Sequence, residues 1–260
     1  MKRIHLFEFE DFNWFPHWIR LRMTRLINVM HKLVGTSQEI TEPIARVLKE
    51  TGATEIVDLC SGSGGPMPEV LEMIRKKPGL ENTHLTLTDL YPDVESAKKF
   101  NNSSDKIKYL TKPVDATQVG AEVPGLRTMV SSFHHMNPTA ARKILESAQQ
   151  SRQPIALFEI SDNAFPVFIW WIAFPINIIS CFFVTLLVRP MSWQQVVFTY
   201  LIPIIPLFFA WDGAVSNART YTLTDMDLLL KGLETKDYTW EKGTIKGKTK
   251  KLYLLGMPAK

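Results

Sequence analysis

The chain has 260 residues, of which 45% are hydrophobic and 22% charged, and its formal net charge is +4. This length fits one large domain with an insertion, and so small a basic excess gives no reason to expect nucleic acid as a partner. The spacing of its two cysteines, Cys60 and Cys181, excludes a disulfide framework and a cysteine zinc site, so we expect a reducing, cytoplasmic setting and no bound metal.

Residues 1–51 are expected to form an N-terminal helical segment or lid. Three acids among the first twelve residues occupy the place where a signal peptide needs its apolar core, so we expect no cleaved signal. A helix follows that ends near Gly35, with apolar side chains on one side at helical spacing. This pattern fits a helix packed on a core and a helix at a membrane interface about equally well. A second helix is expected over 37–51.

Strand and helix patterns alternate over 52–162, which we expect to form one α/β core. Short apolar or alternating runs predict five strands, at 54–60, 84–90, up to about Lys112, 126–136 (with the exit from the strand) and 154–162. Such alternation predicts an α/β fold with a doubly wound, mostly parallel sheet. Residues 212–260 are expected to add a helix, from an N-cap at Thr224 to Gly232, and a β-hairpin that completes seven strands.

An apolar insertion separates these two parts of the core. Residues 164–188 carry no charge and are long enough to span a bilayer, whereas the run 196–211 is short and broken by Pro203 and Pro206. We expect residues 163–211 to form an apolar helical hairpin that contacts a membrane, with the rest of the protein on the cytoplasmic side. A re-entrant loop and an amphipathic lid over an apolar substrate pocket are the alternatives.

The stretch VDLCSGSGGP, residues 57–66, predicts a strand that runs into a glycine-rich turn. Such a turn lets backbone amides approach a nucleotide, because no Cβ atoms stand in the way. In the dinucleotide pattern G-x-G-x-x-G, however, the third glycine position is Met67 here, and Pro66 lacks an amide proton. These two residues argue against a pyrophosphate at this turn.

The same stretch resembles the first motif of the class I methyltransferases, D/E-x-G-x-G-x-G. It runs from Asp58 to Gly64, with Cys60 in place of the first glycine. Asp89 and Asp115 follow the second and third strands, where this family places the acids that bind the ribose and lie near the adenine amine. The resemblance covers about 52–162 and the C-terminal hairpin. It implies a Rossmann-like core that binds S-adenosylmethionine, with contacts from the following residues: Asp58, Ser61, Gly62, Gly64, Asp89, Leu90, Asp115, Ala116 and Phe133.

Cys60 stands at the end of the strand, before the glycines that must bend, so we expect its φ to be negative. A small side chain would then suffice at this position. Cys60→Gly is expected to be tolerated, whereas Gly62→Val is expected to block the cofactor.

Candidate catalytic residues stand where the fourth and fifth strands end, because sites open at that edge of a parallel sheet. His134 and His135 are the candidates for a general base, and we favour His135. One ring is expected to point into the site and the other away. Glu159 is a further candidate, which could hold a substrate amine or ammonium. The acids near the N-terminus would reach this site if that segment folded as a lid.

The stretch 211–222 is similar to a segment of some membrane-associated or lipid-directed methyltransferases. One interpretation is a small-residue loop whose polar groups, with Asp162, face the polar headgroup of a substrate: Asp212, Arg219 and Tyr221. A capped connector with one structural salt bridge fits the stretch at least as well. The expected function is methyl transfer to a lipid or another apolar, membrane-dissolved small molecule. Two alternatives keep the fold: a membrane-tethered binding or scaffolding module without catalysis, and a methyltransferase that docks on a membrane protein.

Overall fold

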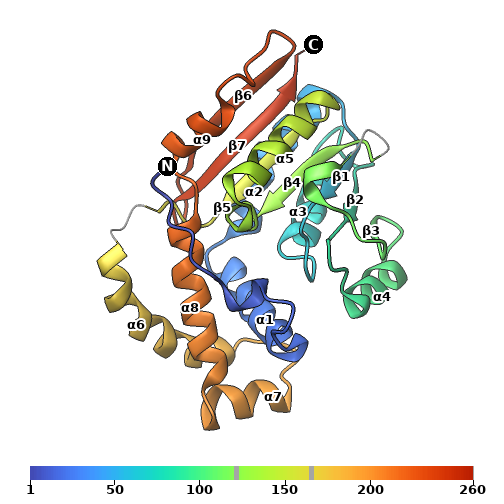
Figure 1. Ribbon diagram of the computed structural model, residues 1–260. Coiled ribbons are helices and arrows are strands. Elements are labelled where there is room, and N and C mark those ends of the chain that lie inside the picture. Colours follow the sequence, from blue (N-terminus) through green and yellow to red (C-terminus); the bar gives the residue numbers. More distant parts are fainter. Residues whose placement is uncertain (120–122, 164–166, 260) are drawn as a thin grey trace.

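A seven-stranded sheet forms the centre of the molecule, in the order β3-β2-β1-β4-β5-β7-β6 (Figure 1). The computed structural model describes residues 1–119, 123–163 and 167–259, without the side chains of 167, 168 and 170–172. The strands are β1 (Glu55–Asp58), β2 (His84–Leu87), β3 (Ile107–Tyr109), β4 (Leu126–Val130), β5 (Ile155–Glu159), β6 (Tyr238–Ile245) and β7 (Lys251–Pro258). β1 to β5 are parallel, and β7 is antiparallel to both of its neighbours. The mixed α/β sheet and its C-terminal hairpin confirm the sequence-based prediction.

Helices cover both faces of this sheet, because successive side chains of a strand point to opposite faces. On β1, Ile56 belongs to one buried cluster and Val57 to another. The first cluster is covered by α2 (Thr36–Thr51), α3 (Met67–Ile74) and α4 (Val94–Ser103). The second is covered by α5 (Pro138–Gln150) and α9 (Leu223–Leu230). Near-continuous apolar strands such as β5, which is buried throughout, are what this two-sided cover requires.

A third apolar core lies at one end of the molecule, away from the hairpin strands (Figure 1). It joins α1 (His17–Leu33) to the segment inserted after β5, which forms α6 (Val167–Thr185), α7 (Trp193–Val196) and α8 (Ile204–Arg219). Met23 and Leu26 of α1 pack there with Cys181 and Ile205. Of the two interpretations of the N-terminal helix, the structure therefore shows the one that packs on a core.

The insertion differs from the expected pair of apolar runs. Among the described residues no single helix is long and apolar enough to cross a membrane, and one bent pair meets that test by length and composition: Trp193–Leu201 and Ile204–Arg219, which meet at 82°. Pro203 stands at the bend, where its ring cannot continue the preceding helix. The first three residues of the expected run 164–188 lie outside the described residues, and its helix ends at Thr185.

Two boundaries near the C-terminus were predicted wrongly. α8 continues to Arg219, so Asp212 and Arg219 lie on a helix and not in a small-residue loop. The alanines of this stretch favour a helix, and one exposed glycine, Gly213, does not stop it. The N-cap of α9 is Thr222 and not Thr224, because the Thr222 side chain and Asp225 form a reciprocal capping box.

Candidate functional site

The glycine turn follows β1 and is hydrogen-bonded to residues at the ends of β2 and β3. The amide of Gly62 donates a hydrogen bond of 2.8 Å to Oδ2 of Asp89, which follows β2. The hydroxyl of Tyr109, at the end of β3, donates to the carbonyl of Gly62 at 2.7 Å. Oδ1 of Asp89 accepts from the amide of Tyr91. A carboxylate offers about four acceptor sites, so Asp89 keeps capacity for two further donors while it holds the turn.

Gly62 and Gly64 differ in what a side chain at each position would contact. A Cβ atom on Gly62 would meet nothing within 4 Å, although its φ of +52° disfavours any side chain. A Cβ atom on Gly64 would lie 2.8 Å from the ring of Phe100. Gly64 is therefore required by packing within the protein, whereas Gly62 leaves open space beside the carboxylate of Asp89.

Cys60 corrects the expectation of a negative φ. Its φ is +58°, in the left-handed region that favours glycine. The turn begins one residue earlier than the sequence indicated, so the position that is glycine in the family motif needs a glycine conformation here too. Burial raises the pKa of the Cys60 thiol well above its ordinary value, so the sulfur stays protonated.

We expect Cys60→Gly to leave the free energy of unfolding within about 1 kcal/mol of the parent value. The relief of an unfavourable φ offsets the lost contacts and the greater entropy of glycine in the unfolded chain. Urea denaturation measures this. Cys181→Gly is the matched control: Cys181 is buried within α6, and we expect that change to cost about 2 kcal/mol or more. Equal losses in both variants would contradict this account of Cys60.

The other expected cofactor residues lie along the same edge of the sheet. Asp58 is buried, and its Oδ1 accepts from the Thr128 hydroxyl at 2.7 Å. Burial raises the pKa of Asp58 to about 7, although hydrogen bonds from Thr128 and Ser61 oppose the rise. Asp115 is exposed, and its side chain caps the 3₁₀ turn that begins with Ala116.

Two of the expected contacts have contrasting surroundings. Leu90 is 45% exposed next to Asp89. Phe133 is buried in the core under α5 and α9, with its ring 5.3 Å from that of Tyr221. The structure therefore places Leu90 where it can touch a ligand and Phe133 where it packs beneath the site.

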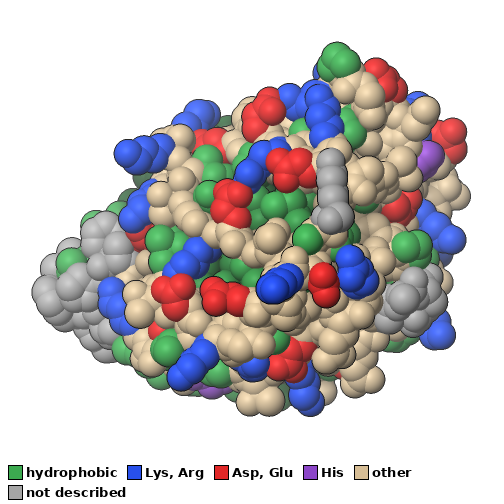
Figure 2. All heavy atoms as spheres, turned by 90° about the horizontal axis from the view of Figure 1, so that it is seen from above, with side chains coloured by type: hydrophobic (Ala, Val, Ile, Leu, Met, Phe, Trp, Pro, Cys, Tyr) green, Lys and Arg blue, Asp and Glu red, His purple; other side chains and the backbone are tan. Residues whose placement is uncertain are grey.

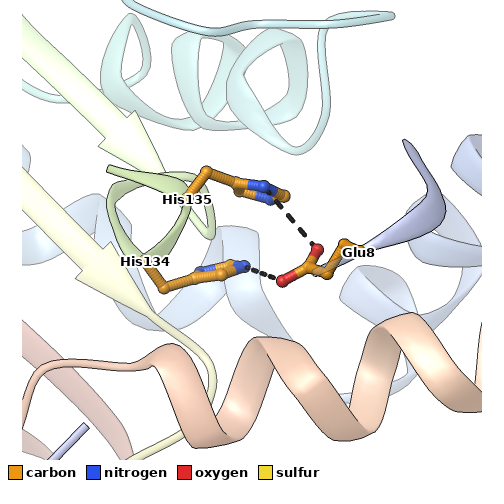
Figure 3. Close-up of side chains that lie close together, drawn as sticks. All are labelled: Glu8, His134 and His135. Carbon is orange, nitrogen blue, oxygen red and sulfur yellow. Dashed lines mark ion pairs between the residues drawn. The ribbon is translucent and has the colours of Figure 1, made fainter. Parts of the chain in front are cut away.

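His134 and His135 follow β4 and both turn towards Glu8 (Figure 3). Their ring centroids are 4.4 Å apart, so the expectation that one ring points away is wrong. The reason is local: residues 133–135 form a 3₁₀ turn and not a strand end. Side chains on such a turn are about 120° apart, whereas neighbours on a strand point to opposite faces.

Carboxylates hold each imidazole ring. Nδ1 of His134 lies 2.9 Å from Oε2 of Glu159, at the end of β5, and the His134 amide donates to Oε1 of the same carboxylate. Nδ1 of His135 lies 2.9 Å from Oδ1 of Asp11. Burial disfavours a charged His135, but the carboxylates of Glu8, Asp11 and Glu10 outweigh burial and raise the pKa of His135 to about 9.

The N-terminal segment crosses this site and is fastened to α8. The amides of Phe9 and Glu10 donate to the two carboxylate oxygens of Asp212, at 2.8 and 3.2 Å. The indole nitrogen of Trp211 donates to the carbonyl of Phe7 at 3.0 Å. Asp212 therefore positions the segment that carries Glu8, whereas the sequence suggested a direct contact with substrate.

Two arginines complete the cluster. Nη1 of Arg219 lies 2.6 Å from Oδ2 of Asp11 and 3.0 Å from Oε1 of Glu8. Arg3 donates to the carbonyl of His134 at 2.8 Å and lies over the ring of Tyr221. Nothing in the sequence near Arg3 signals this contact, because its partners are more than a hundred residues away.

The remaining candidates divide between the cluster and its surroundings. The Tyr221 hydroxyl donates to the carbonyl of Met136 at 2.8 Å, directly after the two histidines. Asp162 is not part of the cluster: it forms an ion pair of 2.8 Å with Lys250. The groups gathered at the ends of β4 and β5 are therefore Arg3, Glu8, Glu10, Asp11, His134, His135, Glu159 and Arg219.

Comparison with known proteins gives a likeness of structure. No family model and no curated protein matches the sequence. The solved structure of the plantazolicin methyltransferase BpumL in complex with SAH (S-adenosylhomocysteine) matches with a TM-score of 0.53 and 9% identity, over 93% of this chain and 98% of that one. This is the class I methyltransferase fold. The O-methyltransferase NcsB1 from neocarzinostatin biosynthesis, solved with S-adenosylmethionine and 2-hydroxy-5-methyl naphthoic acid, matches with a TM-score of 0.53 and 12% identity, over 93% of this chain and 57% of that one.

The methyltransferase fold extends beyond the sheet. Because the match to BpumL covers 93% of this chain, it takes in much of the N-terminal helices and of the insertion as well as the strands. In this fold the glycine turn after β1 and the histidine turn after β4 lie at the same edge, because β1 and β4 are neighbouring parallel strands. The cluster around Glu8 therefore lies at the same edge of the sheet as the glycine turn.

Proposed function

We propose that this protein transfers a methyl group from S-adenosylmethionine to a lipid or another apolar small molecule dissolved in a membrane. The observation that carries the proposal is the pairing of the Gly62 amide with Asp89 at the carboxyl edge of a class I methyltransferase fold. The similar structures of BpumL and NcsB1 were solved with SAH and with S-adenosylmethionine, respectively. These complexes support the choice of cofactor.

The residues present fit this cofactor. Asp89 has acceptor sites left for a vicinal diol, and Gly62 leaves the space beside it open. Among the described residues, the buried hydroxyls of Ser131 and Ser132 have no hydrogen-bond partner, and they follow β4 at the same edge. Ser131 also has a positive φ of 54°, and such strain gathers at ligand sites. Asp58, Ser61, Gly64, Leu90, Asp115 and Ala116 complete the proposed contacts.

The cluster after β4 is suited to act on the methyl acceptor. Methyl transfer needs an acceptor lone pair in line with the sulfonium and a route for the acceptor proton. The bond to Glu159 fixes the orientation of the His134 ring, so that Nε2 faces Glu8. The sequence favoured His135 as the general base, but we assign this role to His134, because Glu159 orients its ring. Glu159 positions His134, and His135 with Asp11 forms the wall of the site.

Incubation with S-adenosylmethionine labelled in its methyl group, with total lipid extract in detergent, tests the proposed reaction. Label is expected in an organic-soluble product, together with release of S-adenosylhomocysteine. A variant with His134→Ala serves as the control for contaminating activity. Cofactor binding without any turnover in lipid extract would favour the non-catalytic binding module instead.

The insertion is the basis for proposing a membrane-associated acceptor. Arg189 is the only charged residue from 163 to 211. Large apolar side chains are more than half exposed on α6, directly after α6, on α7 and at the bend before α8. We call this set the apolar end: Ile179, Phe183, Leu187, Trp193, Leu201 and Ile202. Exposed apolar side chains gathered on one segment indicate a contact with a membrane or a protein.

Charge favours a membrane as the occupant. Figure 2 shows the end of the molecule opposite the apolar end, where the parallel strands begin. Acidic and basic side chains are interspersed over that end. Two arginines lie at the margin of the apolar end. One is Arg189, and the other is Arg25 of α1, which donates a hydrogen bond to the carbonyl of Pro190. Basic groups beside an apolar surface suit an anionic bilayer. We propose that the apolar helical hairpin rests in the cytoplasmic face of a membrane and delivers the acceptor to the adjacent site.

We expect the protein to co-sediment with vesicles of phosphatidylcholine and phosphatidylglycerol, and Trp193→Glu or Leu201→Glu to weaken the partition coefficient by about tenfold or more. Burial of one such side chain contributes roughly 1.5–3 kcal/mol. Leu228→Glu, at an apolar residue of α9 that is 49% exposed, is the matched control and should bind like the parent. Binding that is equal in all variants, or absent for the parent protein, would contradict the membrane proposal and favour a protein partner.

A further inference from the structure

Within the part of the chain that the structure describes, Glu8 and His134 carry buried polar atoms without a hydrogen-bond partner, although Oε1 of Glu8 forms an ion pair of 3.0 Å with Arg219. Glu8 is fully buried, and among the described residues neither of its carboxylate oxygens has a hydrogen-bond partner. Nε2 of His134, buried as well, also has none. Such groups are costly to leave without partners, so their convergence indicates a ligand. Both imidazole rings face the Glu8 carboxylate (Figure 3).

The geometry is close to that of a metal site. One ligand atom from each of Glu8, His134 and His135 can be chosen so that all three lie within 4.8 Å of one another. Nε2 of His134 is 4.0 Å from Oε1 of Glu8, and Nδ1 of His135 is 3.6 Å from Oε2. Two ligands of one transition-metal ion at ~2.1 Å are roughly 3–3.5 Å apart, so small side-chain shifts would close the site.

The surroundings prepare His134 to act as a ligand. Its Nδ1 is hydrogen-bonded to Glu159, which leaves the lone pair of Nε2 directed to Glu8. In metal sites, a ligating histidine usually donates its other ring N–H to a carboxylate, which fixes the orientation of the ring. Asp11, 2.9 Å from Nδ1 of His135, adds a further oxygen within reach of an ion.

The charges of the cluster favour a cation. The carboxylates of Glu8, Glu10, Asp11 and Glu159 gather around the two histidines. The opposing positive charges are the guanidinium groups of Arg3 and Arg219 and the protonated ring of His135, which would release its proton when it binds an ion. Arg219 forms an ion pair with Glu8, but it also binds Asp11 at 2.6 Å and the carbonyl of His135 at 3.0 Å. These two contacts can hold the guanidinium in place when Glu8 takes another cation.

We propose that Glu8, His134 and His135 bind one divalent transition-metal ion, such as Zn²⁺, Mn²⁺ or Fe²⁺. Two imidazoles and one carboxylate are a ligand set for these ions and not for Ca²⁺ or Mg²⁺, which prefer oxygen. The role of the ion rests on the proposed function: it would bind a hydroxyl group of the acceptor and lower the pKa of that group. The proton would pass to water, and the oxygen would take the methyl group as S-adenosylhomocysteine leaves. His134 then acts as a ligand and does not take the proton itself.

Metal content of the full-length, untagged protein tests this proposal directly. After chelator treatment and dialysis, the protein is titrated with Co²⁺ and Zn²⁺, followed by the cobalt absorption spectrum and by elemental analysis. One ion per chain is expected. Glu8→Gln and His134→Ala should each weaken binding at least 100-fold, and Glu159→Gln about 10- to 100-fold, because it only orients His134.

His84→Ala is the matched control, since His84 is exposed at the start of β2, and it should bind cobalt like the parent protein. Circular dichroism establishes that each variant is folded, and Glu159→Gln keeps the test informative if Glu8→Gln does not fold. No bound ion in the parent, or binding that these variants leave unchanged, would overturn the metal site. Calorimetry with S-adenosylmethionine is independent of this readout, so failure of the metal site and failure of the proposed function are distinguishable.

Discussion

Replacement of His134 with alanine is expected to lower kcat for methyl transfer by about two to four orders of magnitude. His134 is held by Glu159 through Nδ1 and presents Nε2 to the interior of the cluster. Whether Nε2 takes the acceptor proton or binds an ion, its loss removes the group that acts on the acceptor. Steady-state kinetics with a lipid acceptor measures the effect, and the dissociation constant of S-adenosylmethionine should stay within about threefold.

Two further variants sharpen this prediction. Glu159→Gln keeps one acceptor oxygen for the two His134 donors and loses the charge, so we expect a smaller loss of roughly 10- to 100-fold in kcat. His17→Ala, at an exposed residue of α1, should leave kcat unchanged. A His134→Ala protein that is folded and retains more than half of the parent rate would show that the cluster is structural.

Gly62→Val is expected to weaken S-adenosylmethionine binding by more than about 100-fold, or roughly 2.7 kcal/mol. The φ of +52° is unfavourable for a β-branched residue, and the new side chain would project into the open space beside Asp89. The same change would disturb the hydrogen bond that the Gly62 amide donates to Asp89. Isothermal titration calorimetry measures the effect.

Gly64→Ala is the informative comparison for this prediction. Its Cβ atom would meet the Phe100 ring at 2.8 Å, so the expected damage is to folding. The midpoint of thermal unfolding should fall for Gly64→Ala and change less for Gly62→Val. Normal cofactor affinity in a folded Gly62→Val protein would mean that the cofactor does not lie against this turn.

The sheet could be predicted from the sequence because its signals are local. Apolar runs of strand length alternate with helical spacing from β1 to β5, and the residues that pack on the two faces alternate as in Ile56 and Val57. Asp58 ends the first strand, and Asp89 and Asp115 follow the second and third strands. From this order the sequence predicted that the glycine turn lies at the carboxyl edge of the sheet, where the structure has it.

The cluster around Glu8 could be predicted only in part. His134 and Glu159 were expected at adjacent strand ends, because neighbouring parallel strands finish at one edge. The 3₁₀ turn that brings both rings to one side depends on packing after β4, as does the φ of Cys60 after β1. The acids near the N-terminus were expected at this site if their segment folded as a lid, and Glu8 lies there. The contact of Arg3 with His134, more than a hundred positions away, leaves no local pattern.

Composition alone could not predict which apolar residues of the insertion are buried and where its helices end. A run without charges satisfies a bilayer and a buried core equally well. Cys181 and Ile205 face α1, whereas Phe183 and Leu201 are exposed, and this division depends on tertiary packing. The bend at Pro203 was signalled by the sequence, but the continuation of α8 through Asp212 was not, because hydropathy changes there while helix propensity does not.

Titration of the purified protein with S-adenosylmethionine by calorimetry tests the central claim most directly. We expect one site per chain, with a dissociation constant of about 1–100 µM, competition by S-adenosylhomocysteine, and a loss of at least tenfold in affinity on Asp89→Ala. A folded protein that binds neither compound, or an Asp89→Ala variant with unchanged affinity, would contradict the assignment of this edge of the sheet as a cofactor site.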